Sequence, residues 1–150
     1  MITDSIEINR SPQDVFDYLD QLDRHGEWQS QIVSVELETD GPTRVGSRAA
    51  ETRKMGGREQ RLRYEVTEHD PPRRFDFRGI DGPLRPVGKG TIEPIGDGSS
   101  SRFTLEFEFE GHGFGKLLAP FALRQARKQI AQDHQQLKQR LEHNEESGGR

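Results

Sequence analysis

The sequence contains no cysteine, and apolar residues occupy only 29% of its 150 positions. Without cysteine the chain can form no disulfide, thiolate zinc site or iron–sulfur cluster, and it has no cysteine nucleophile. No stretch approaches the roughly 18 consecutive apolar residues of a membrane span, and the acidic start lacks the basic and apolar regions of a signal peptide. We therefore expect a cytoplasmic protein with a thin core, a single domain over 1–143 and a polar tail over 144–150.

The net charge of −4 is unevenly distributed, with positive charge concentrated in residues 44–89. A basic block can attract nucleic acid, because phosphate binding needs clustered lysine and arginine. Glu51, Glu59, Glu65 and Glu68 interrupt this cluster. Its aromatic residues alternate with charges, as in half-buried strands, and form no run on which bases would stack. We expect no nucleic-acid partner.

Apolar and polar residues alternate along much of the chain, as they do in strands with one wet face. The clearest example is 101–110, in which Phe103, Leu105, Phe107 and Phe109 share one side. Turns rich in glycine, aspartate and proline separate such segments, and we interpret 81–88 and the Gly88-Lys89-Gly90 fragment as connection and turn. Seven strands are predicted, over 1–9, 32–38, 45–54, 58–68, 73–79, 89–95 and 101–110.

Three helical segments are predicted. Ser11-Pro12-Gln13-Asp14 supplies a capping hydroxyl, a proline at the first helical position and an acid in the first turn. Residues 21–31 indicate a second short helix or an irregular turn. After Gly113 the period becomes helical, and one stripe of a long helix collects Ala119, Leu123, Ala126, Ile130, His134, Leu137 and Leu141. Pro120 should kink this helix or mark where its regular part begins.

The order of these elements predicts an α+β fold. An antiparallel sheet with one apolar face has to cover that face, and the long terminal helix is the only element long enough to do so. We therefore expect a curved seven-stranded sheet wrapped around the helix, with two short helices between its first and second strands.

At this point the chain resembles the START-like, or SRPBCC, superfamily with its helix-grip fold, and within it the polyketide cyclase/dehydrase-like branch. Five local segments carry this resemblance: Ile6-Glu7-Ile8-Asn9-Arg10-Ser11-Pro12, Trp28, Val45-Gly46, Val66-Thr67-Glu68 before Pro71-Pro72-Arg73, and Phe114-Gly115-Lys116-Leu117-Leu118. It covers residues 2–141. The resemblance implies a cavity between sheet and helix that holds a hydrophobic ligand, and in some members catalytic groups that line it.

The residues are compatible with such a cavity. Small side chains on the helix stripe would leave room opposite large aromatic ones on the strands, although the aromatic rings could equally fill that space. Tyr64 alternates with apolar neighbours and should point inward. The candidate cavity residues are Trp28, Glu51, Tyr64, Phe77, Phe107, Ala122 and Ala126.

Catalysis would need a titratable pair inside the cavity. Either Ser47, Ala49, Glu51 and Arg53 or the alternate residues of that strand face inward, and the sequence leaves both registers open. An inward Glu51 is a plausible acid or base, with Tyr64 or His134 as its partner. His134 alone is more typical of a structural core histidine. No histidine has the carboxylate spacing of a metal site, and no motif indicates a cofactor.

The leading hypothesis is a binding protein for a lipid-like, polyketide-like or aromatic compound. The alternative is a cyclase or dehydrase in which an inward acid–base pair drives ring closure or loss of water. A third class, an interaction module, draws on Leu117 and Phe121, which lie off the main stripe and would pack under a loop, gate the cavity or contact another subunit, for example in a homodimer.

Overall fold

The fold is known from a computed structural model, which describes the backbone of residues 1–148 and the side chains of residues 1–143. Seven strands form one antiparallel sheet in the order β1-β7-β6-β5-β4-β3-β2. They are β1 (Ile2–Ile8), β2 (Ile32–Leu37), β3 (Arg48–Met55), β4 (Arg58–Asp70), β5 (Arg74–Gly79), β6 (Leu84–Ile95) and β7 (Ser100–Gly111). The helices are α1 (Pro12–Leu19), the 3-10 helix η1 (Leu22–Glu27) and α2 (Gly115–Gly148). The predicted α+β helix-grip fold is confirmed.

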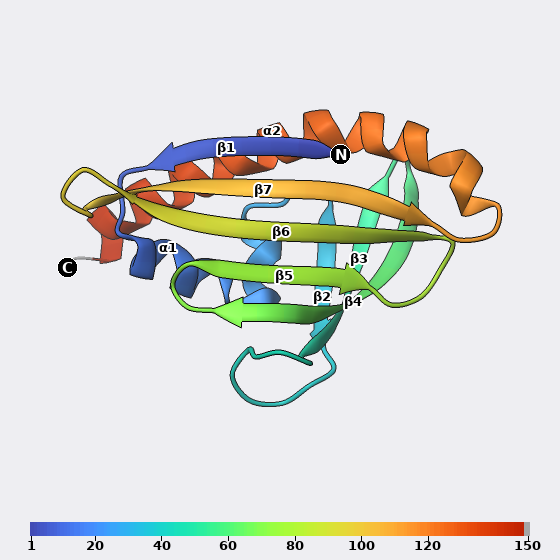
Figure 1. Cartoon of the computed structure of the whole chain (residues 1–150), viewed down its shortest axis with the longest axis horizontal. Coiled ribbons are helices and arrows are strands. Elements are labelled where there is room, and N and C mark those ends of the chain that lie inside the picture. Colours follow the sequence, from blue (N-terminus) through green and yellow to red (C-terminus); the bar gives the residue numbers. More distant parts are fainter. Residues whose placement is uncertain (149–150) are drawn as a thin grey trace.

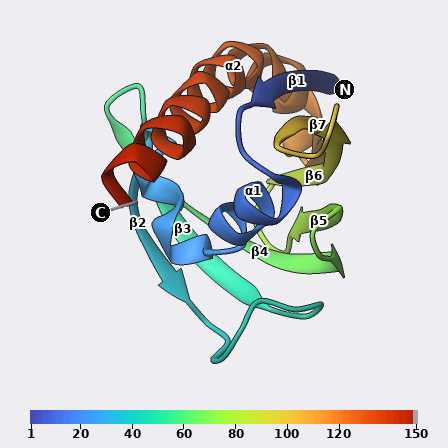
Figure 2. The ribbon, with the colours of Figure 1, turned by 90° about the vertical axis from the view of Figure 1, so that its left-hand side faces the viewer.

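The sheet is curved, and the helices lie on its concave side. Figure 1 shows α2 running along the length of the sheet, and Figure 2 shows the sheet curling around α1, with α2 along the open side between the edge strands β1 and β2. The main contacts of α2 are with β1 and β7. No described helix is both long and apolar enough to cross a membrane.

Helix α1 begins where the sequence predicts it. The Ser11 hydroxyl accepts a hydrogen bond from the backbone N–H of Asp14 at 3.2 Å, and Pro12 occupies the first turn. The helix buries Val15, Phe16 and Leu19 against the sheet, mainly on β6 and β7. It therefore shares the concave face of the sheet with α2 (Figure 2).

Strand β6 corrects the prediction for residues 81–90. It begins at Leu84, five residues earlier than expected, and the Gly88-Lys89-Gly90 fragment lies inside it rather than in a turn. A Cβ atom at Gly88 would lie 2.3 Å from the Phe77 ring, and one at Gly90 would lie 2.4 Å from the Phe75 ring. Both glycines are there because two phenylalanine rings of β5 lie directly over the β6 backbone.

Helix α2 contains Pro120 in its second turn. Its first turns are inclined to the rest of the helix in Figure 1, as expected where a proline removes a backbone donor. The polar tail predicted for residues 144–150 lies outside the part of the chain whose side chains are described.

Candidate functional site

The packing between sheet and α2 loosens from one end of the molecule to the other. Along β7 the inward residues change from Phe103, which is 1% exposed, to Leu105 at 8%, and then to a half-buried Phe107. Along α2 the stripe is fully buried at Leu137 and Leu141 and only half-buried from Ile130 back toward Gly115. Because β7 leads directly into the start of α2, both loosely packed stretches lie at the same end.

Two chains of ring contacts follow this division. In the tightly packed half, Trp28, His134, Phe103 and Phe75 follow one another with centroid separations of 6.3, 5.1 and 6.1 Å. In the loosely packed half, Tyr64, Phe77, Phe107 and Phe109 do so at 5.8, 6.5 and 5.1 Å. The second chain therefore brings three predicted site residues, Tyr64, Phe77 and Phe107, together on the inner face of the sheet.

Tyr64 places a polar atom among these rings. Its side chain is 7% exposed, and its hydroxyl is buried with no hydrogen-bond partner among the described residues. Burial raises the pKa of Tyr64, and the negative charge of Glu51 adds to the effect, so the phenol stays protonated. The hydroxyl is thus a buried donor that a ligand oxygen could satisfy.

The pairing of β3 decides which of its faces points inward. Ala49 pairs with Tyr64, and Glu51 pairs with Leu62, so Glu51 lies on the inner face with Tyr64. Of the two registers left open by the sequence, the one with Ser47, Ala49, Glu51 and Arg53 inward is the one observed.

Glu51 and Arg53 form an ion pair inside the molecule. The Arg53 Nε donates to Glu51 Oε1 at 2.6 Å. The Glu51 side chain is only 10% exposed, and the Arg53 side chain is 16% exposed. Gln29 and Gln31, from the connection into β2, accept hydrogen bonds from the remaining guanidinium nitrogens. The sequence predicts that either face of β3 would carry charge into the interior. This network pairs that charge and gives it hydrogen-bond partners.

His134 belongs to the tightly packed half. It is 2% exposed, and its Nδ1 lies 2.6 Å from Asp4 Oδ2 on β1. Burial lowers the pKa of His134, and the hydrogen bond to Asp4 opposes this effect. The ring therefore ties α2 to the edge strand β1, and its contacts in the structure are with Asp4, Trp28 and Phe103 rather than with Glu51.

The other predicted site residues lie on two elements. Ala122 and Ala126 are half-buried on the first half of α2, on the side where the packing is loose. Trp28 follows η1, is 7% exposed and packs in the tightly packed half. Its indole Nε1 is buried and, like the Tyr64 hydroxyl, has no partner in the described part of the chain.

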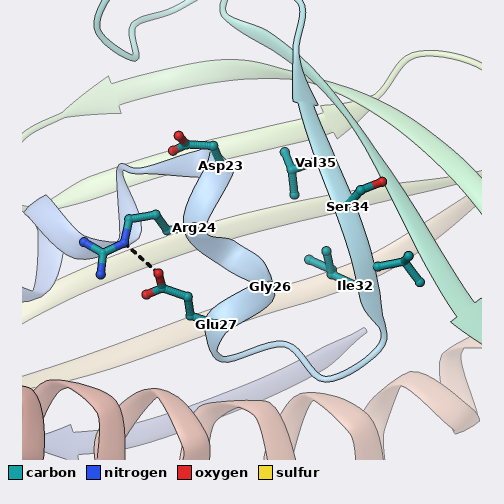
Figure 3. Close-up of a pocket in the computed structure, with 8 residues that line it drawn as sticks. Asp23, Arg24, Gly26, Glu27, Ile32, Ser34 and Val35 are labelled. Atoms are coloured by element: carbon teal, nitrogen blue, oxygen red, sulfur yellow. Dashed lines mark hydrogen bonds and ion pairs between the residues drawn. The ribbon is translucent and has the colours of Figure 1, made fainter.

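A separate pocket of about 260 Å³ lies between η1 and β2 and contains none of the predicted site residues. Figure 3 shows Glu27 and Arg24 of η1 facing one another across from Ile32 and Val35 of β2. Arg24 lowers the pKa of Glu27 to about 2, and Glu27 also bonds to Tyr18 and Arg140. These contacts link η1 to α1 and α2, so we assign them a structural role.

The list of predicted site residues left out two inward residues, Arg53 and Phe109, although both have the right alternation in the sequence. The register of β3 places Arg53 on the same face as Tyr64, and a ring contact places Phe109 against Phe107. Within residues 1–143, no group of three or more histidine and carboxylate side chains is arranged to hold a metal ion.

Solved structures resemble this fold over nearly the whole chain. An aromatase/cyclase, Zhui from Streptomyces sp. R1128, has a TM-score of 0.77 at 11% identity, covering 94% of this chain and 92% of its own. A START superfamily protein from Mycobacterium smegmatis has a TM-score of 0.73 at 12% identity, covering 95% and 97%. The protein TTHA0849 from Thermus thermophilus has a TM-score of 0.72 at 20% identity, covering 93% and 95%. At these identities the likeness shows a shared fold.

The family is shown by sequence. No curated protein matches the chain. The model of the family described as polyketide cyclase/dehydrase and lipid transport matches residues 1–142, and with this match and the START-like fold the chain belongs to that family.

Proposed function

We propose that the protein binds a hydrophobic small molecule between the inner face of β4, β5 and β7 and the first half of α2. The observation that carries this proposal is the change in packing along the molecule. The inward rings of Phe77 and Phe107 and the alanines of α2 are half-buried, whereas Phe103 of β7 and Leu137 and Leu141 of α2 are buried at the other end.

Half-buried rings on an inner face favour a ligand for a physical reason. Covering apolar surface stabilises a complex by about 25 cal/mol for each Å² removed from water. A ligand that lies against Phe77 and Phe107 gains this free energy without displacing a packed side chain. Binding sites of this kind are mostly apolar, with few polar groups that fix orientation.

The polar groups beside the rings indicate the kind of ligand. Tyr64 offers an unpartnered hydroxyl, and the Glu51–Arg53 pair lies on the same inner face. A planar aromatic or polyketide-like compound with a carbonyl or hydroxyl oxygen would stack on the rings and accept a hydrogen bond from Tyr64. The family description and the aromatase/cyclase neighbour support this class.

Native mass spectrometry of the protein purified from its own organism tests the proposal. We expect an adduct of a few hundred daltons that disappears on denaturation and can be identified after solvent extraction. A thermal-shift panel of naphthols, anthraquinones and fatty acids should raise the melting temperature for at least one class. An empty protein whose melting temperature no compound raises would overturn the proposal.

A cyclase or dehydrase activity is the second candidate, favoured by the polar groups inside the molecule. In such a reaction the Tyr64 hydroxyl would donate to the substrate carbonyl, and Glu51 would accept a proton from the carbon beside it. Glu51 would then give this proton to the hydroxyl group on the next carbon, which leaves as water. Incubation of the bound compound with wild type and Glu51→Gln, followed by mass spectrometry for the loss of one water, tests this role. Turnover that the variant retains in full would exclude Glu51 as the base.

A further inference from the structure

The start of α2 exposes an unusual number of large apolar side chains. Phe114, Leu117, Leu118 and Phe121 are 68%, 76%, 44% and 68% exposed. On a helix of 3.6 residues per turn Leu117 and Phe121 lie opposite the half-buried stripe that faces the sheet, and Leu118 lies at its side. Phe114 belongs to the turn just before the helix. Figure 1 shows these first turns at one end of the molecule, where they are accessible from outside. We call this set of four residues the apolar face.

Positive charge lies beside the apolar face. Lys116, Arg124, Arg127 and Lys128 are all exposed, and no aspartate or glutamate occurs between Glu110 and Asp133. None of the four forms an ion pair with a described residue, although twelve other lysine and arginine side chains within residues 1–143 do. A local block of unpaired cations thus stands out in a protein whose net charge is −4.

We propose that the apolar face and its four cations dock on an anionic lipid surface. A helix with bulky apolar residues on one side and lysine and arginine beside them lies in the interface plane of a bilayer. The apolar side chains enter the boundary between headgroups and acyl chains, and the cations pair with anionic headgroups. The contact is peripheral, since the described part of the chain contains no membrane-spanning helix.

Charge favours a lipid surface over a second copy of the chain as the occupant. In a twofold dimer the same patch meets itself, so the cations of both copies would approach one another without a carboxylate from this segment. An anionic bilayer instead supplies the opposite charge. The docking goes beyond the proposed ligand binding and does not depend on it, because it uses exposed residues on the outside of α2. The two proposals can fail separately, since ligand binding is measured in solution without vesicles.

Vesicle flotation tests the docking. Full-length protein is mixed with phosphatidylcholine vesicles with or without about one third phosphatidylglycerol. We expect binding to the anionic vesicles only, with weaker binding in high salt because salt screens exposed charges. The double variants Leu117→Ser/Phe121→Ser and Arg124→Gln/Lys128→Gln should each bind about tenfold more weakly. The first removes apolar side chains that enter the boundary between headgroups and acyl chains. The second removes two cations, each of which contributes severalfold to binding near an anionic surface.

Matched variants elsewhere on the surface are the controls. Val33→Ser/Val45→Ser removes two exposed apolar side chains, and Arg44→Gln/Lys89→Gln removes two cations that have no ion pair among the described residues. Both should float like wild type. No flotation of wild type, or equal loss in the control variants, would overturn the proposal. A dimer in analytical ultracentrifugation that Leu117→Ser/Phe121→Ser dissociates, without vesicle binding, would assign the face to self-association and overturn it as well.

Discussion

The two tyrosines of this chain lie in opposite hydrogen-bonding situations. The Tyr64 hydroxyl is buried without a partner among the described residues, whereas the Tyr18 hydroxyl donates to Glu27 Oε1 at 2.8 Å. A buried polar group without a partner destabilises the folded state, and a hydrogen bond to a charged group stabilises it. The same substitution to phenylalanine should therefore have different effects at the two positions.

We expect Tyr64→Phe to leave the free energy of unfolding unchanged or to raise it by about 1 kcal/mol. The same substitution should lower ligand affinity five- to tenfold. Tyr18→Phe should lower stability by about 1 to 2 kcal/mol and leave ligand affinity unchanged. Urea unfolding and ligand titration measure both quantities. Equal ligand affinity in wild type and Tyr64→Phe would show that the hydroxyl takes no part in binding.

His134 predicts a pH dependence of stability. Burial lowers its pKa in the folded protein, so as pH falls below about 6.5 the unfolded chain takes up a proton first. The contribution of the neutral ring to the free energy of unfolding is thus fully present above that pH. It is lost as pH decreases toward the lower pKa of the folded state, by up to about 1.4 kcal/mol per pH unit. Burial also lowers the pKa of His25, which adds to the same slope.

Urea unfolding between pH 5 and 8 checks this expectation. His134→Gln should flatten the decline in stability at acidic pH, with the remaining slope due in part to His25. His143→Gln serves as the control for the substitution, because that side chain is exposed. A decline that His134→Gln leaves as steep as in wild type would mean that the hydrogen bond with Asp4 cancels the effect of burial on the pKa of His134.

At the scale of elements, strand β6 shows how sequence patterns can mislead. Gly88 and Gly90 look like turn residues, because glycine is frequent in turns. Their role depends on Phe75 and Phe77 of the neighbouring strand, whose rings take the space where a Cβ atom would be. Only strand pairing reveals this use of glycine, so the start of β6 could not be found from the sequence.

Gly88→Ala tests this packing. The added methyl group would meet the Phe77 ring at 2.3 Å, and we expect a loss of about 1 to 3 kcal/mol in stability because the ring has to move. Gly26→Ala is the matched control, since its Cβ would make only an ordinary contact of 3.4 Å with Ile32. Thermal and urea unfolding compare the two. A Gly88→Ala variant as stable as wild type would mean that Phe77 has free space to enter.

For the whole molecule, the decisive property is how closely α2 packs on the sheet. Ala126→Leu would place a larger side chain on the half-buried side of α2, facing the loosely packed half. We expect ligand affinity to fall at least tenfold while stability stays equal or increases, because leucine fills space and buries more apolar surface. Ala131→Leu, at an exposed position of the same helix, should change neither. Isothermal titration with the ligand found by mass spectrometry measures the difference.

If Ala126→Leu lowered stability by several kcal/mol, the helix and sheet would already be closely packed there, and the binding proposal would lose its basis. If Ala126→Leu bound the ligand as tightly as Ala131→Leu does, the ligand would have to bind elsewhere in the fold.

The sequence by itself determined the element order, the capped start of α1, the strand alternation and the amphipathic stripe of α2. These features depend on neighbours within a few residues, so local periodicity contains them. It also supplied the aromatic residues that line the inner face.

Only the tertiary structure decided the rest. The inward face of β3, the partners of Glu51 and His134, and the division of the interior into a tightly and a loosely packed half all depend on residues far apart in the chain. A shift of one residue in register would reverse every side chain of β3, and no local pattern fixes that register when both faces of the strand are polar.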